Sequence, residues 1–340
     1  MRMRIAVMGI SVVLLSAAFA QAAGKPSCDR ACLESYVDRY MDAMLAHDPS
    51  PALFAKNIKF TENGVRLPFG NEGLWYDMAG KGTYKFYIPD VETQQIAFIG
   101  TAKEGGSAPR AKTLAGEVGA RLAAAKPSPK ADAKPAEPTV VAIALRLKIV
   151  NKLIAEVEQL VIHPDTNAMG AAISSKFPPT GVSVEKLGSP RKIFSEAIPE
   201  AERASREELI KTANYYFTGL ARNDGEGYYP FTDDCERLEN GMLATRECKK
   251  QFESGALFNI VSRIRDRRFV AVDRERGIVF SFGFFDHEQI NWTWQIAELF
   301  RTERGKIRLI EALFQRCPDG MNSGWSTYEK GMSEEAQSIR

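Results

Sequence analysis

The tripeptide Glu-Asn-Gly occurs twice, at the ends of KFTENG (Lys59–Gly64) and ERLENG (Glu236–Gly241), 177 positions apart. Asn-Gly is a favoured two-residue hairpin turn, because both turn positions need a positive φ. Each tripeptide also follows a stretch with apolar residues at strand-like spacing. The repeat therefore predicts a duplicated unit in which one strand ends at each glutamate, Glu62 and Glu239.

Further segments extend this duplication along the chain. Five pairs share their pattern of apolar residues: Leu33–Asp48 with Leu209–Asp224, Phe54–Gly64 with Phe231–Gly241, Ile88–Asp90 with Ile264–Asp266, Ile96–Gly100 with Val279–Gly283, and Ile154–Glu158 with Ile307–Glu311. The first pair has the spacing of an amphipathic helix, and the last two have that of strands. We expect each copy to run from a helix through the Glu-Asn-Gly strand to β-hairpins.

The offset between the two copies changes along the chain. It is 176 or 177 for the first three pairs, 183 for the fourth and 153 for the last. The step to 183 predicts a slightly longer hairpin in the second copy. The later drop corresponds to an excess in the first copy, where Lys103–Pro138 is rich in Ala, Lys, Pro and Gly. Such a composition does not offset the entropy of ordering, so we predict a disordered insertion at about 104–138.

The amino terminus has the layout of a secretory signal peptide. Arg2 and Arg4 precede Ile5–Ala20, an uncharged apolar run of 16 residues, and small residues follow. A membrane span needs about 20 residues, so this run is short for an anchor. We predict a signal peptide over residues 1–22, a periplasmic or secreted protein, and no membrane span after cleavage.

Export would allow disulfides to persist. Cys28 and Cys32 are four positions apart, and Cys235 and Cys248 are 13 apart. We predict these two pairs, with Cys317 free. The pairing rests on proximity alone, because five cysteines with one left over allow 15 arrangements.

Several classes of function find no support in the sequence. A formal net charge of +2 is not the signature of a nucleic-acid binder, which concentrates basic residues on one face. The three histidines are scattered, so we predict no metal site. The chain has no nucleophile elbow, phosphate-binding loop or dinucleotide fingerprint, and we predict no cofactor.

The pattern Phe-x-x-(Asn/Asp)-x-x-x-x-Glu, at Phe54–Glu62 and Phe231–Glu239, follows an amphipathic helix in each copy. With Gly-Lys-Ile-x-x-Ile-Glu at Gly305–Glu311, it resembles the SnoaL-like, nuclear-transport-factor-two-like superfamily. The first copy departs from this ending at Lys152-Leu153. The tandem, exported layout also resembles a bacterial group of unknown function.

The resemblance implies an α+β fold with two consecutive cone-shaped domains. Each would be a curved, mostly antiparallel sheet wrapped by about three helices around an apolar pocket. We place the first domain at 27–164, a connector at 165–203 and the second domain at 204–330. Members of this superfamily include isomerases, cyclases, hydrolases, dehydratases and binding modules, so the fold implies no single reaction.

In enzymes of this superfamily an acid at the end of the matching strand often points into the cone. By motif position the resemblance assigns that role to Glu62 and Glu239. A carboxylate in an apolar pocket has a raised pKa and can transfer a proton next to a carbonyl. The alternative is that each glutamate faces solvent beside a simple Asn-Gly turn.

Other candidates are weaker. His287 is either a proton shuttle or a loop histidine without a role. Trp294 shares one face with Trp292 and either lines the pocket or fills the core. The predicted substrate-binding set is completed by aromatic and turn residues: Asn63, Trp75, Tyr84, Tyr87, Asn240, Phe258 and Trp294.

Two functional hypotheses remain open. The first is an exported protein that binds a small molecule, with cofactor-independent acid/base catalysis as a lyase, isomerase or hydratase on a small apolar or aromatic substrate. The second is a non-catalytic binding or interaction module whose two cones pack as an internal pseudo-dimer.

Overall fold

The computed structural model describes residues 28–105, 137–164, 177–257 and 261–340. The predicted signal peptide, most of the predicted insertion, part of the predicted connector and Phe258 lie outside these residues. Within the described ranges, every helix is too short or too polar to span a bilayer.

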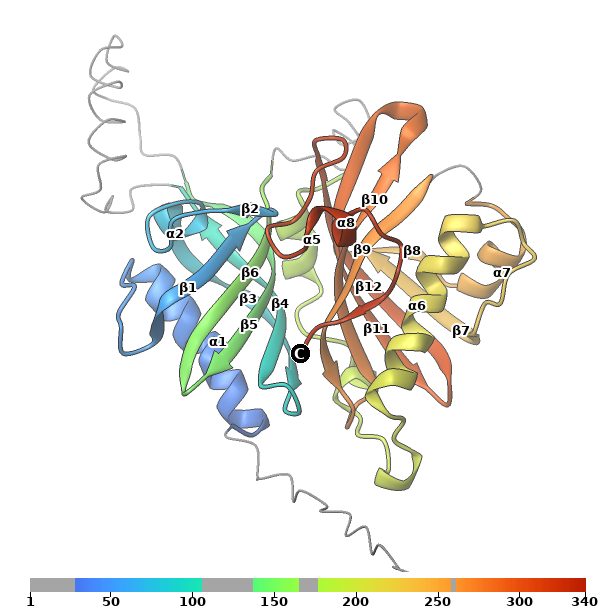
Figure 1. Ribbon diagram of the computed structural model, residues 1–340, viewed down its shortest axis with the longest axis horizontal. Coiled ribbons are helices and arrows are strands. Elements are labelled where there is room, and N and C mark those ends of the chain that lie inside the picture. Colours follow the sequence, from blue (N-terminus) through green and yellow to red (C-terminus); the bar gives the residue numbers. More distant parts are fainter. Residues whose placement is uncertain (1–27, 106–136, 165–176, 258–260) are drawn as a thin grey trace, which may run out of the picture.

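Two mixed, curved β-sheets stand side by side (Figure 1). The first has the order β2-β1-β6-β5-β4-β3. Its strands are β1 Phe54–Glu62, β2 Val65–Arg66, β3 Met78–Asp90, β4 Gln95–Glu104, β5 Thr139–Val150 and β6 Leu153–Ile162. The second has the order β13-β9-β10-β11-β12-β7-β8. Its strands are β7 Phe231–Glu239, β8 Met242–Thr245, β9 Arg263–Asp273, β10 Ile278–His287, β11 Trp292–Glu303, β12 Lys306–Cys317 and β13 Gln337–Ser338.

One long helix covers each sheet, whereas the resemblance implied about three helices around each. These helices are α1 Arg30–Leu45 and α6 Arg206–Arg222. The Asp29 side chain caps α1, and a Ser205–Glu208 capping box begins α6. The remaining described helices are short: α2 Leu74–Asp77, α5 Thr180–Lys186, α7 Cys248–Glu253 and α8 Tyr328–Gly331, with 3₁₀ turns η1 Lys192–Ser195, η2 Glu200–Glu202 and η3 Glu288–Ile290.

The backbone pairing repeats between the two sheets. β1 pairs in parallel with β6 so that Glu62 lies opposite Gln159, and β7 pairs in parallel with β12 so that Glu239 lies opposite Ala312. These partners differ by the offsets of 177 and 153 expected from the sequence. Both pairs also carry a register shift after their first residue pair. Apart from β13, the two sheets have the same strand order.

One predicted match is wrong. Asp90 ends β3 opposite Gln95, and Asp273 ends β9 opposite Ile278, so Asp90 corresponds to Asp273 and not to Asp266. The turns that follow, 91–94 and 274–277, have equal length. The predicted longer hairpin is therefore also wrong, and the extra residues of the second copy come earlier, before the end of β9.

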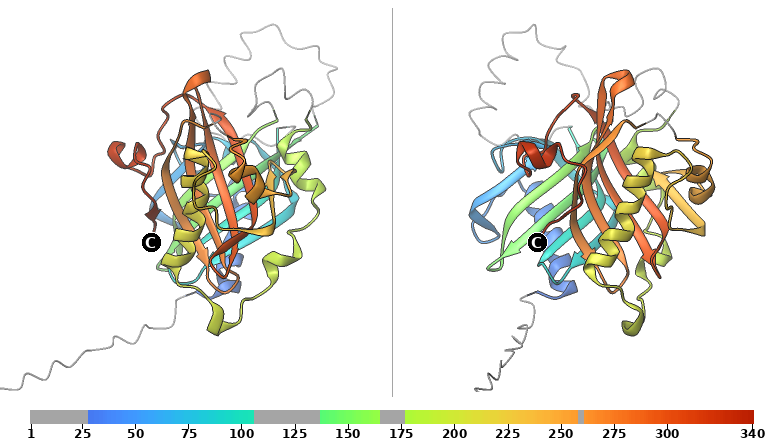
Figure 2. Two further views of the ribbon diagram at one scale, coloured as in Figure 1. Left: turned by 90° about the vertical axis from the view of Figure 1, so that its right-hand side faces the viewer. Right: turned by 45° about the vertical axis from the view of Figure 1, so that its right-hand side comes forward.

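Three apolar cores hold the fold together. The first inner face, on the side of the first sheet covered by α1, is packed around Tyr40 and Trp75. The second inner face, on the side covered by α6, is packed around Tyr216 and Phe300. The opposite faces of both sheets meet in an intersheet core that contains Phe86 of β3 and Phe280, Phe282 and Leu299 of the second sheet. The two sheets thus bury one face each against the other (Figure 2).

The C-terminal segment binds both sheets. Its β13 pairs with β9, and its Trp325 reaches β1, where the indole donates a hydrogen bond of 2.7 Å to Thr61. Lys59 and Arg146 lie over the Trp325 ring, at 4.0 and 4.5 Å from its centroid. These contacts fix the position of one sheet relative to the other.

Candidate functional site

The repeated Asn-Gly pairs form hairpin turns, and their asparagine side chains also bind the neighbouring parallel strand. Asn63 and Asn240 have φ values of 51° and 50°, and the following glycines both have 77°. The Asn63 side chain accepts a hydrogen bond from the Val161 amide, and Asn240 accepts one from the Phe314 amide. Both asparagines therefore have a structural role at equivalent places in the two sheets.

On the first inner face, Glu62 is buried within a hydrogen-bond chain. Its Oε2 accepts from the Leu74 amide at 2.9 Å and from the Gln159 side chain at 2.7 Å. Tyr40 donates to Gln159 at 2.6 Å, and the Trp75 indole donates to Tyr40 at 2.9 Å. Burial raises the pKa of Glu62, although its two donors favour the ionised form. The Glu62 side chain is buried on the first inner face. The Leu74 amide and the Gln159 side chain hold it in place.

Aromatic side chains fill the first inner face. Trp75 is fully buried, and its ring packs edge-on against Tyr40, Phe54 and Phe69 at centroid distances of 4.6 to 5.7 Å. Tyr87 lies at the border of this core, where its hydroxyl donates to Asp38. In the described part of the chain, this arrangement is that of a packed core.

On the second inner face, the buried acid lies two strands away from the expected position. Glu239 of β7, Ala312 of β12 and Glu298 of β11 lie opposite one another in a single row across three strands. Glu298 is fully buried, whereas the side chain of Glu239 is 36% exposed. In the first sheet the matching row is Glu62, Gln159 and Leu145. The two copies have therefore placed their buried carboxyl on different strands.

The surroundings of Glu298 favour its neutral form. Burial raises the pKa of Glu298 to about 8, although Arg237 and the Tyr216 hydroxyl favour the ionised form. The Tyr216 hydroxyl lies near the Glu298 carboxyl, but among the described residues neither carboxyl oxygen makes a hydrogen bond of good geometry. Buried polar atoms are nearly always satisfied, so such a group needs a functional or structural explanation.

Arg237 and Glu239 complete this cluster. The Arg237 Nε lies 2.9 Å from Glu239 Oε1, and the arginine is 5% exposed. Glu239 reaches solvent at the border of the buried group. We call Tyr216, Arg237, Glu239 and Glu298 the Glu298 cluster.

Sequence reasoning missed Glu298, Arg237 and Tyr216 as site residues. A signal for Glu298 was present in the strand alternation. Trp294, Ile296 and Phe300 lie on the second inner face, and Glu298 shares their parity. An acid between apolar residues on one face of a strand is a candidate buried carboxyl.

His287 lies far from this cluster. It pairs with Trp292, whereas Glu298 pairs with Ser281, six residues away along β10 and so about 20 Å distant. Its ring packs against Trp294 at a centroid distance of 4.2 Å, and burial lowers the pKa of His287 to about 4. The structure therefore does not bring His287 together with Glu239 or Glu298.

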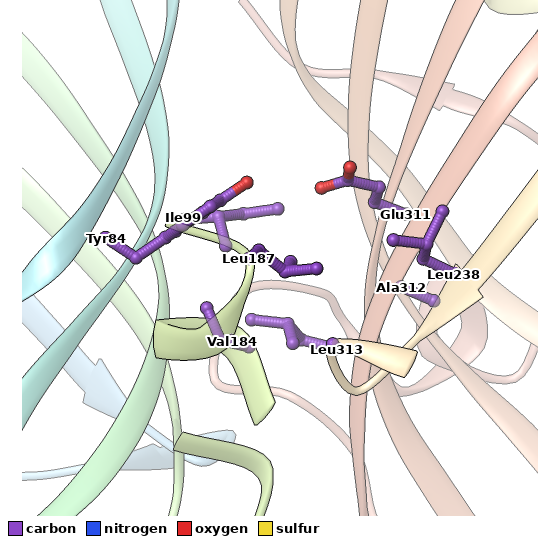
Figure 3. Close-up of a pocket in the computed structure, with 9 residues that line it drawn as sticks. Tyr84, Ile99, Val184, Leu187, Leu238, Glu311, Ala312 and Leu313 are labelled. Atoms are coloured by element: carbon purple, nitrogen blue, oxygen red, sulfur yellow. The ribbon is translucent and has the colours of Figure 1, made fainter. Parts of the chain in front are cut away.

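Tyr84 lies between the sheets and not on the first inner face. It faces Glu311 of β12 across a cavity of about 10 Å³, which Val184 and Leu187 of the α5 region close (Figure 3). A cavity of this size holds about one water molecule. In the described residues the Tyr84 hydroxyl has no hydrogen-bond partner. Burial raises the pKa of Glu311 to about 7, although Arg191 favours the charged form.

Replacing Glu311 by Gln is expected to stabilise the protein at alkaline pH. The folded carboxyl ionises at about pH 7 and the unfolded one near 4.5, so stability is lost as pH rises through this window. Glu311→Gln should avoid this loss and exceed the wild type by up to about 3 kcal/mol in unfolding free energy at pH 8. Urea unfolding at pH 5 and pH 8 measures it. An equal gain in the exposed control Glu253→Gln would contradict this explanation.

The cysteines agree with one predicted disulfide and bring the second pair into contact. Cys28 and Cys32 form a disulfide. Cys235 of β7 and Cys248 of α7 are not bonded, but their buried sulfurs lie 2.6 Å apart. This is closer than two unbonded sulfurs normally pack, and a disulfide measures about 2.05 Å.

We expect protein purified without reductant to contain the Cys235–Cys248 disulfide. Alkylation in denaturant without reductant should then modify Cys317 alone, as measured by mass spectrometry of the intact protein. A closed loop of this size contributes about 3 kcal/mol, so the Cys235→Ser variant should be less stable. Three alkylated cysteines would show that the pair stays reduced.

Comparisons with known proteins add a family match and two similar folds. A family model described as a domain of unknown function (DUF8021) matches residues 202–314, from η2 to β12. No curated protein matches the chain in sequence. A de novo designed protein with a curved β-sheet is similar in structure, with 19% identity over 32% of this chain and 87% of that chain, and a TM-score of 0.25. An NTF-2 like protein of unknown function from Burkholderia xenovorans has 11% identity over 32% of this chain and 84% of that chain, and a TM-score of 0.25.

Proposed function

We propose that the second inner face binds a small molecule and that Glu298 transfers a proton there. The observation that carries this proposal is a fully buried carboxyl, without a hydrogen bond of good geometry among the described residues, whose pKa is raised to about 8. A group with a pKa near the working pH can both give and take a proton at small cost. The reaction class is that of a cofactor-independent lyase, isomerase or hydratase.

The other members of the cluster have distinct roles in this proposal. Neutral Glu298 gives its proton to the substrate, and Arg237 stabilises the carboxylate that remains until it takes a proton back. The Tyr216 hydroxyl orients the reacting oxygen. The Tyr216 ring packs against Phe252 at 5.4 Å and against Phe300 at 5.3 Å, and these rings keep water out. Apolar surroundings of this kind suit a small apolar or aromatic substrate.

Turnover by glutamine variants tests the catalytic role. With a panel of small aromatic ketones and unsaturated acids, the wild type should turn over at least one compound, and Glu298→Gln should lose most of that activity. Glu62→Gln is the matched control, because Glu62 is also buried but lies on the filled first inner face. Full turnover by Glu298→Gln would remove this residue from the mechanism.

The intersheet core favours a second candidate function, that of a non-catalytic interaction module. The shared strand order and register support a tandem of SnoaL-like domains at 27–164 and 204–330 that pack as an internal pseudo-dimer. The Cys28–Cys32 disulfide supports a place of action outside the cytosol. The absence of both turnover and ligand binding in the wild type would favour this candidate.

A further inference from the structure

The Glu298 cluster contains hydrogen-bond donors that none of its own acceptors satisfies. Arg237 is 5% exposed, and neither its Nε nor its Nη1 has a hydrogen-bond partner of good geometry in the part of the chain that the structure describes. Glu239 lies beside the Nε of the same guanidinium, at 2.9 Å. Glu239 thus forms an ion pair with this buried cation, while Nε and Nη1 are both left without a hydrogen bond of good geometry in the described chain.

An unpaired guanidinium nitrogen is costly to bury, because it has lost hydration and gained nothing in return. The planar fork of arginine matches a carboxylate better than any other common ligand group. We propose that Arg237 binds the carboxylate of a small aromatic acid at the second inner face. This inference rests on the proposed small-molecule site and names the class of compound that it takes.

The charges around Arg237 are compatible with a bound anion. The cluster holds one cation, Arg237, and one exposed carboxylate, Glu239. At neutral pH, Glu298 and Tyr216 each carry a proton that they can donate. A ligand carboxylate would accept hydrogen bonds from these groups, whereas an ammonium would meet three donors and a neutral amide would gain less from the cation.

The apolar surroundings define the rest of the ligand. The rings of Phe231 and Phe252 lie 4.9 Å apart, and Tyr216 packs against Phe252 at 5.4 Å. Aromatic walls of this kind favour a flat, apolar body through offset and edge-on ring contacts. Glu239 is the member of the cluster that solvent reaches, so a ligand would approach from its side.

Isothermal titration of the mature protein with benzoate and phenylacetate tests the proposal, with benzamide and phenylacetamide as neutral matches. At pH 7 the acids should bind at least about 10-fold more tightly than the amides. Arg237→Met should weaken binding of the acids by about 10- to 100-fold, since a hydrogen bond to a charged group is lost. Arg246→Met removes an arginine whose side chain is 70% exposed, and it should leave binding unchanged.

Three results would overturn the proposal: no binding of either acid at millimolar concentration, equal binding of acids and amides, or unchanged binding in Arg237→Met. Circular dichroism and melting temperature establish whether the Arg237 variants fold. Arg237→Lys, which keeps the charge but not the fork, should retain part of the affinity. A second measurement needs no Arg237 variant: affinity for benzoate should fall as pH rises through about 8 in the wild type, and not in Glu298→Gln.

This experiment separates the ligand class from the reaction. If the acids bind through Arg237 but no compound is turned over, the catalytic proposal fails and the ligand class holds. If neutral compounds are turned over by the wild type and lose turnover in Glu298→Gln, while the acids bind no more tightly than the amides, the ligand class is wrong and the catalytic proposal holds.

Discussion

Glu298→Gln should be more stable than the wild type at pH 9 by up to about 5 kcal/mol in unfolding free energy. The unfolded chain releases the Glu298 proton near pH 4.5, whereas the folded chain holds it until about pH 8. Stability from the buried neutral acid is therefore complete below pH 4.5 and declines as pH rises to 8. A glutamine stays neutral throughout and avoids the decline.

Urea unfolding at pH 5, 7 and 9 measures this difference. The advantage of Glu298→Gln should be near zero at pH 5 and should grow through pH 7 to pH 9. Glu288→Gln is the control, because Glu288 is exposed in η3, which connects β10 to β11. A constant difference across the three pH values would mean that Glu298 titrates alike in the folded and unfolded chains.

Trp75→Ala is expected to lower the unfolding free energy by about 3 to 5 kcal/mol. The indole is fully buried, packs against Tyr40, Phe54 and Phe69, and donates to the Tyr40 hydroxyl. Removing the indole would leave an apolar cavity between the Tyr40, Phe54 and Phe69 rings. Denaturant unfolding at pH 7 measures the loss.

The exposed Tyr328→Ala is the control and should change stability by less than about 0.5 kcal/mol. Indole should raise the melting temperature of Trp75→Ala but not that of the wild type, because an apolar cavity in a core binds apolar molecules. A loss below about 1 kcal/mol in Trp75→Ala would show that Trp75 is not a core residue and that the first inner face has room for a ligand.

The repeated strand order of the two sheets was predictable because its evidence is local and repeated. The Asn-Gly turns after Glu62 and Glu239, and the offsets of 177 and 153, appear again in the strand pairing. The three-residue match of Asp90 with Asp266 failed, because so short a match has no structural constraint behind it. In the strand pairing, Asp90 lies opposite Gln95 and Asp273 lies opposite Ile278, so Asp90 and Asp273 occupy equivalent positions.

The site was less predictable, because it depends on which strands become neighbours. Glu239 and Glu298 are 59 positions apart, and their common row exists only once β12 lies between β7 and β11. Motif position alone assigned equal roles to Glu62 and Glu239. Burial separates them, since Glu62 is held by Gln159 and the Leu74 amide while Glu239 is partly exposed beside Arg237. Tyr84 likewise lies between the sheets and not on the first inner face, because its position in β3 points it to the opposite face. A run of aromatic residues does not reveal this.

The most direct test of the account is the titration of the Glu298 carboxyl itself. In protein labelled with ¹³C at the glutamate carboxyl carbon, the Glu298 signal is assigned as the one missing from Glu298→Gln. Its chemical shift should change with a midpoint near pH 8. A midpoint near pH 4.5, the ordinary value for glutamate, would show a solvated carboxylate and would contradict both the buried acid and the function built on it.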